Sequence, residues 1–129
     1  MAQDLRTYLR QLMKQDPRSV RIVDKEVSPR FGITAYAAAL AEKGDYTALL
    51  FNRVEGSELS CISNLLTSYE RIALYLGCEV QDIPRVYGER LQRPIDPVVI
   101  DRSGATVKET IVAEGDVDLG KLAIPGHNQ

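Results

Sequence analysis

Residues suited to metal binding and nucleophilic chemistry are scarce in this chain. It contains two cysteines, Cys61 and Cys78, and a single histidine, His127. A structural zinc site needs several Cys or His ligands at short spacing, and the sequence offers no such group. The cysteines lie outside any CxxC spacing in apolar or small-residue surroundings, and nothing supports a disulfide between them. We therefore expect two buried, reduced thiols, as in a cytosolic protein.

The common catalytic and nucleotide-binding fingerprints are also absent. The sequence has no GxGxxG, no GxxxxGK[ST] and no GxSxG, and these motifs mark dinucleotide sites, P-loops and hydrolase nucleophiles. The sequence shows no strained serine turn that could supply a nucleophile for His127 to activate. We therefore do not expect His127 to act as a catalytic base. Asp116 and Asp118 are typical of a solvated edge or a capping turn rather than of an acid/base pair. Ser63 and Asn64 could line a pocket, although capping the helix that follows is the expected role.

An excess of one charge and a long apolar run are missing as well. Sixteen basic residues against eighteen acidic ones give a net charge of −2, which does not favour general nucleic-acid binding. Acidic residues alternate with Arg85, Arg90 and Arg93, which indicates a solvated helix face. No stretch approaches a membrane span, and the start of the chain has no apolar signal region. We expect a cytoplasmic protein with a single domain over residues 1–129, long enough to close its own core.

Hydrophobic periodicity predicts an α+β fold, a small mixed sheet with flanking helices. The apolar run from Tyr46 to Phe51 is typical of a central strand buried on both faces. Thr67 and Glu70 form a capping-box pattern that starts a helix. The expected elements are a helix that starts at Leu5 after the cap Asp4 and is ended by Asp16-Pro17, a strand over 19–27 with Val20 and Ile22 on one face, a helix from Ser28-Pro29 to Leu40 followed by Gly44, strands over 46–51 and 59–66, a helix over 67–76 ended by Gly77, a helix over 82–93, and a hairpin of strands 97–101 and 105–113.

Several segments, in this order, resemble the UbiD family of decarboxylases. They are Asp4-Leu-Arg-Thr-Tyr-Leu9, Val20-Arg-Ile-Val-Asp-Lys-Glu-Val27, Ala48-Leu-Leu-Phe-Asn-Arg-Val54 with Gly56, Ser63-Asn-Leu-Leu-Thr-Ser-Tyr-Glu-Arg-Ile-Ala-Leu-Tyr-Leu-Gly77, Pro97-Val-Val-Ile100, and Glu114-Gly-Asp-Val-Asp-Leu-Gly-Lys-Leu-Ala-Ile-Pro125. The resemblance extends over nearly the whole chain, which makes it stronger than any single motif.

The resemblance implies an enzyme that reversibly decarboxylates aromatic, heteroaromatic or α,β-unsaturated acids. Such an enzyme uses prenylated FMN with a divalent metal, typically Mn²⁺, and K⁺, and the substrate forms an adduct with the cofactor. A small α/β N-terminal domain precedes a flavin-binding domain and a C-terminal domain used in oligomerisation. The family's cofactor, metal and Glu-Arg-Glu positions lie beyond the segment ending at Ile124-Pro-Gly-His127, where this sequence continues with Asn128-Gln129. We therefore assign no catalytic, cofactor-binding or metal residue in this chain.

Three functional hypotheses follow. In the first, the chain is the N-terminal domain of a UbiD-like carboxy-lyase, as a fragment or split subunit that is inactive alone and acts with a flavin-binding domain. In the second, it is a non-catalytic accessory or interaction subunit derived from that domain. In the third, it is an unrelated small enzyme that uses His127 or the pair Asp116 and Asp118.

Overall fold

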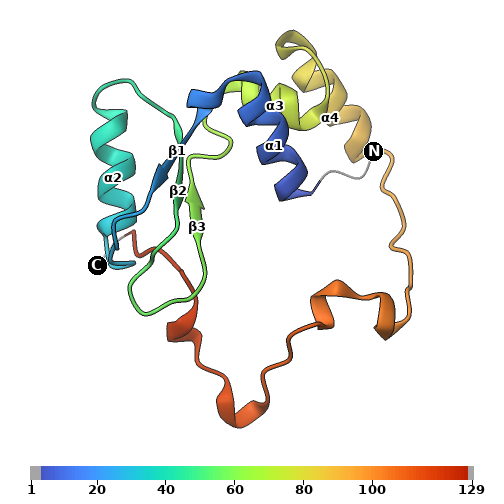
Figure 1. Ribbon diagram of the computed structural model, residues 1–129. Coiled ribbons are helices and arrows are strands. Elements are labelled where there is room, and N and C mark those ends of the chain that lie inside the picture. Colours follow the sequence, from blue (N-terminus) through green and yellow to red (C-terminus); the bar gives the residue numbers. More distant parts are fainter. Residues whose placement is uncertain (1–3, 128–129) are drawn as a thin grey trace.

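The computed structural model describes residues 4–127 and shows a three-stranded mixed sheet with helices on both faces (Figure 1). The strands are β1 (Val20–Val23), β2 (Ala48–Phe51) and β3 (Cys61–Ser63), in the order β1-β2-β3. β2 pairs in parallel with β1 and antiparallel with β3. The predicted mixed sheet with flanking helices is thereby confirmed, and β2 occupies the predicted central position.

Four α-helices surround this sheet, and their ends follow local sequence signals. They are α1 (Leu5–Gln15), α2 (Gly32–Ala41), α3 (Tyr69–Leu76) and α4 (Ile83–Leu91). The Asp4 carboxylate caps α1 by accepting from the Thr7 amide at 2.7 Å, as predicted. Gly44 and Gly77 follow α2 and α3 with φ values of 69° and 66°. Since few side chains tolerate this conformation, glycine is well placed to end both helices there.

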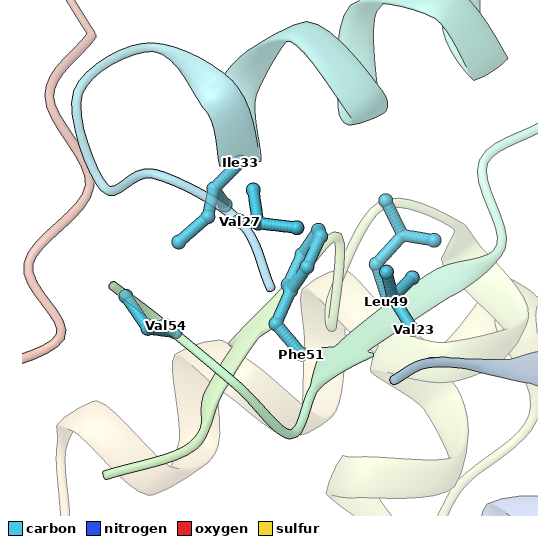
Figure 2. Packing of buried hydrophobic residues seen from close by; sticks show 6 residues of the cluster. All are labelled: Val23, Val27, Ile33, Leu49, Phe51 and Val54. Atoms are coloured by element: carbon cyan, nitrogen blue, oxygen red, sulfur yellow. The ribbon is translucent and has the colours of Figure 1, made fainter. Parts of the chain in front are cut away.

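Two hydrophobic clusters hold these layers together, one on each face of the sheet. Under α2, Ile33 packs on Leu49 and Phe51 of β2 with Val23, Val27 and Val54 (Figure 2). Under α1, Tyr8 and Leu12 pack on Val20 and Ala48. Ala48, Leu49 and Phe51 are fully buried. Because these side chains face clusters on both sides of the sheet, β2 is apolar without alternation.

The boundaries predicted for α2, β1 and β3 are wrong, and β3 spans Cys61–Ser63 where a strand over 59–66 was predicted. Ser28 and Pro29 do not begin α2, because Val27 is held in a bridge to Val54 and the helix starts only after Phe31, whose φ is 65°. Strand β1 is shorter than 19–27, and Ile22 is half exposed although it shares the face of Val20. Its neighbour Leu50 packs against the α1 cluster, so the helices cover only one end of this sheet face.

The predicted hairpin over 97–113 is also wrong, because these residues form short 3-10 turns and extended coil with no strand among them. We call residues 94–122 the arm and residues 4–93 the body. The arm leaves α4, runs apart from the layered body and returns beside it (Figure 1). Nothing in the body pairs with the arm's alternating residues, so they lack the partner that a strand needs. No helix of the described residues is long and apolar enough to cross a membrane.

Candidate functional site

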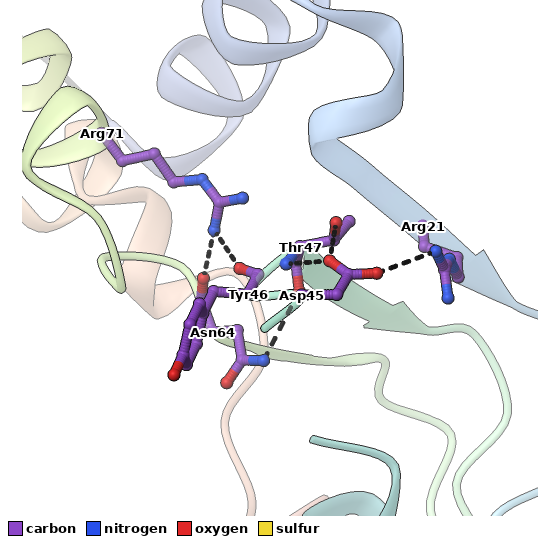
Figure 3. A network of polar contacts seen from close by, with 6 residues as sticks. All are labelled: Arg21, Asp45, Tyr46, Thr47, Asn64 and Arg71. Carbon is purple, nitrogen blue, oxygen red and sulfur yellow. Dashed lines mark hydrogen bonds and ion pairs between the residues drawn. The ribbon is translucent and has the colours of Figure 1, made fainter. Parts of the chain in front are cut away.

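The densest polar cluster of the body surrounds Arg71 of α3. Its Nη1 donates to the carbonyl oxygens of Tyr46 at 2.7 Å and Asn64 at 2.8 Å (Figure 3). It also donates to Thr67 Oγ1 at 3.1 Å. Charge-assisted hydrogen bonds of this length are among the stronger polar contacts in proteins. Arg71 therefore ties the start of β2 and the turn after β3 to the first turns of α3.

Asp45 forms the second half of this cluster, just before β2. Its carboxylate accepts from the Thr47 amide at 2.9 Å and from the Thr47 hydroxyl, and it pairs with Arg21 of β1 at 3.2 Å. The hydrogen bonds from Thr47 lower the pKa of Asp45, and the charge of Arg21 lowers it further. An ionised, fully engaged carboxylate at neutral pH is suited to fixing the loop and unsuited to general acid catalysis.

Asn64 belongs to this cluster and Ser63 precedes it, and neither residue lines the two cavities described below. Asn64 adopts a φ of 57°, and its Nδ2 donates to the Thr47 carbonyl at 3.5 Å. Asn is one of the few residues that tolerates this conformation at modest cost. The Ser63 Oγ is buried and makes no hydrogen bond with a described residue. The predicted capping box of Thr67 and Glu70 is wrong, because α3 begins after Ser68, whose Oγ accepts from the Arg71 amide at 3.4 Å.

Several open cavities flank the helices, and two of them have arginine side chains in their lining. One of about 480 Å³ lies beside the cluster, and its charged lining residues are Arg18, Arg21 and Arg71 with Asp16 and Glu70. A larger one of about 800 Å³ borders α1, α3 and the root of the arm, where its lining includes Arg90 and Arg93. A guanidinium nitrogen of Arg90 donates a hydrogen bond to the Leu76 carbonyl oxygen at 2.6 Å. This bond satisfies one of the carbonyl groups that are free at the end of α3. Neither lining contains a nucleophile held by a base, which covalent catalysis requires.

The remaining sequence candidates lie apart from both cavities. His127, Asp116 and Asp118 are exposed, and the Asp118 carboxylate accepts from the Gly120 amide at 2.8 Å, as a capping turn would. Arg85 pairs with Asp82 and Glu89 on the surface of α4, which confirms the solvated face. Both cysteines are free thiols, and the prediction that they are buried is wrong, because both are only half-buried. Burial raises the pKa of the Cys61 thiol, which disfavours the reactive thiolate.

The donor set of the described residues does not fit the metals of a prenylated-FMN site. Residues 4–127 contain no group of three or more His, Cys, Asp or Glu side chains arranged to hold a metal ion. Divalent metals of this kind are held by clustered carboxylate and imidazole ligands. The described residues therefore offer no metal centre, and the contacts of Arg71 with the Tyr46 and Asn64 carbonyls join β2 and the turn after β3 to α3.

Comparison with known proteins identifies the family. The model of the 3-octaprenyl-4-hydroxybenzoate carboxy-lyase N-terminal domain family, UbiD_N, matches residues 12–91. The chain belongs to the UbiD family. This match ends with α4, so it covers most of the body and leaves out the arm.

Individual UbiD relatives extend the match into the arm. The chain is 29% identical over 125 residues to a phenolic acid decarboxylase of Sedimentibacter hydroxybenzoicus, covering 92% of this chain and 25% of that protein. A dimeric, evolved form of the UbiD-class enzyme HmfF from Pelotomaculum thermopropionicum, solved with prFMN, matches 99% of this chain and 29% of its own at a TM-score of 0.81 and 29% identity. The vanillic acid decarboxylase of S. hydroxybenzoicus in closed form matches 94% and 26% at a TM-score of 0.70 and 28% identity. The chain thus spans between a quarter and a third of these relatives.

The sequence did not single out Arg71, although it lies in one of the segments that carry the UbiD resemblance. Hydrophobic periodicity cannot distinguish an arginine that binds backbone carbonyls at the start of an amphipathic helix from an arginine that only faces solvent. Only the approach of the Tyr46 and Asn64 carbonyls, which depends on the sheet, gives it a role.

Proposed function

We propose that this chain supplies the N-terminal domain of a prenylated-FMN-dependent decarboxylase. Its substrates would be aromatic, heteroaromatic or α,β-unsaturated carboxylic acids. The observation that carries the proposal is the match along 99% of the chain to HmfF with prFMN, together with the match to a phenolic acid decarboxylase. Because both relatives are more than three times longer, the reacting groups would lie on polypeptide outside this chain.

The domain would act as a scaffold rather than as a source of catalytic groups. Prenylated FMN would supply an electron sink for decarboxylation when bound by the flavin-binding part. That part would also hold Mn²⁺ and K⁺, since residues 4–127 contain no cluster of three or more His, Cys, Asp or Glu side chains for a divalent metal. The residues of this chain would fix the shape of the body through Arg71 and the two cores, and so present a defined surface to the flavin-binding part.

The test uses the complete enzyme, which contains this chain as its N-terminal domain. The enzyme is purified and loaded with prenylated FMN. We expect a flavin absorption spectrum and release of CO₂ from at least one acid of a panel that covers the three substrate classes. The 129-residue chain alone, as the matched control, should bind no flavin and release no CO₂. Turnover by the isolated chain, or a flavin-loaded enzyme that decarboxylates no acid of the panel, would contradict the proposal.

A further inference from the structure

The arm carries an unusual density of exposed apolar side chains. Across residues 91–122, every residue except Ala105 is exposed. Large apolar patches on a protein surface commonly mark a site that another polypeptide covers. Ten large apolar residues of the arm are exposed: Ile95, Val98, Val99, Ile100, Val107, Ile111, Val112, Val117, Leu119 and Leu122. Two of them, Ile95 and Val99, are more than nine-tenths exposed.

The body holds the arm at both ends. At its root, Arg90 fixes α4 against the end of α3. At its far end, the Ser57 hydroxyl donates to the Lys121 carbonyl at 2.6 Å, and the Gly126 amide donates to the Pro29 carbonyl at 2.8 Å. Ala123 packs against the cluster under α2. The arm is therefore a loop tethered at two points, and its apolar residues between them have no surface of the body to cover.

The arm lies within the part of this chain that matches a much longer enzyme. A match over 99% of the chain at a TM-score of 0.81 leaves too few residues outside for the arm to be missing from it. This chain corresponds to 29% of that enzyme, so most of the enzyme's polypeptide lies outside the matched part. Such polypeptide is available there to cover the arm, and the isolated domain lacks it.

We propose that the arm is the surface on which this domain docks onto the flavin-binding part of the enzyme, an inference that rests on the proposed function. The arm contains six acidic and three basic residues, and none of them forms an ion pair with a described residue. The matching surface should therefore be apolar with basic residues at its edge. The same acidic excess disfavours a second copy of the arm as the occupant, because like charges would face each other.

The test compares trypsin cleavage after Arg102 and Lys108 in the 129-residue chain and in the complete flavin-loaded enzyme. We expect cleavage at least about tenfold slower in the enzyme, because cleavage follows the population of accessible arm. The double substitution V98D and V99D should restore rapid cleavage in the enzyme. Tyr69→Asp is the matched control, because Tyr69 is an exposed apolar residue of α3 outside the arm, and it should leave the protection unchanged.

Flavin absorption and CO₂ release are measured on the same preparations. An enzyme that binds flavin and releases CO₂, yet is cleaved in the arm as fast as the isolated chain, would overturn the docking surface and leave the proposed function standing. A complete enzyme with no flavin and no CO₂ release would overturn the proposed function instead. If the isolated chain sediments as a dimer with a protected arm, the surface belongs to a second copy and the proposal fails.

Discussion

The body and the arm use the same kinds of residue with opposite results. In the body, Leu49 and Phe51 are 0% exposed between two helical layers. In the arm, Val98 and Val99 are 83% and 96% exposed. Burial of such side chains is the main favourable term in folding, at about 25 cal/mol per Å² of apolar surface. The body is therefore stabilised by its own hydrophobic clusters, whereas the apolar side chains of the arm remain exposed to solvent.

This contrast shows that apolar content alone does not mark a core. An apolar segment adds to stability only where a second surface removes it from water. The sheet supplies that surface for α1 and α2, and no part of the body supplies it for the arm. Substitutions that act on one region and spare the other test this distinction.

The largest effect is expected in the core under α2. Phe51→Ala should lower the free energy of unfolding by about 3–5 kcal/mol, because it removes a fully buried ring and leaves a cavity. The ring also makes an edge contact with Tyr36 at a centroid distance of 5.7 Å. Urea denaturation followed by circular dichroism measures the change. Should this variant fail to fold, Ile33→Val at a neighbouring buried position should cost about 0.5–1.5 kcal/mol.

Val99→Ala in the arm is the matched control. Because Val99 is almost fully exposed, its truncation should change the free energy of unfolding by less than about 0.5 kcal/mol. A loss for Val99→Ala as large as that for Ile33→Val would mean that the arm packs in the isolated chain, and the contrast between the regions would fail.

A smaller effect is expected at the polar cluster. Arg71→Met should cost about 1–3 kcal/mol, because the Tyr46 and Asn64 carbonyls lose a charged donor. Arg85→Met is the control, since its two ion pairs lie on the solvent-exposed surface at α4 and its loss should cost clearly less than that of Arg71. Equal losses in the two variants, measured by urea denaturation, would remove the structural role assigned to Arg71.

The smallest effect is a change in the pH dependence of stability at Asp45. Since the folded state lowers the pKa of this carboxyl, its contribution is present above the usual pKa of Asp and is lost as the pH falls through the folded-state value. Asp45→Asn should therefore lower the urea midpoint of unfolding at pH 7. It should also reduce the difference between the urea midpoints measured at pH 7 and at pH 3. Asp4, whose pKa is lowered by hydrogen bonds from Thr7, keeps its own share of the acid dependence.

Asp96→Asn in the arm serves as the control for this prediction. Asp96 is exposed and makes no hydrogen bond or ion pair with a described residue, so the pH profile should match that of the unsubstituted chain. An unchanged profile for Asp45→Asn as well would show that the contacts with Thr47 and Arg21 do not stabilise the fold.

Local signals in the sequence were sufficient for much of the body. The cap at Asp4, the stops at Gly44 and Gly77 and the central position of β2 depend on short-range chemistry or on one continuous apolar run. The start of α2 did not follow its Ser-Pro signal, because Val27 forms a bridge with Val54, a residue distant in sequence that follows β2. Ile22 was placed on the correct face, yet the extent of helix cover over that face is a tertiary property.

The arm was mispredicted for a related reason. The alternation of apolar and polar residues over 105–113 is typical of a half-buried strand. This pattern indicates that one face is apolar, but it does not identify the polypeptide that covers that face. Likewise, the network of Arg71 depends on carbonyl groups that the sheet brings together. The prediction that no catalytic residue lies in this chain was reached from a resemblance, and it stays a prediction until the complete enzyme is assayed.

Hydrogen exchange along the chain tests the distinction between body and arm most directly. In the isolated 129-residue chain, we expect amides of β2 to exchange only with global unfolding, and amides of residues 94–118 to exchange at nearly the rate of an unfolded peptide. In the complete enzyme, the arm amides should become protected while β2 is unchanged. Protection of the arm already in the isolated monomeric chain, or no gain of protection in the enzyme, would contradict the account.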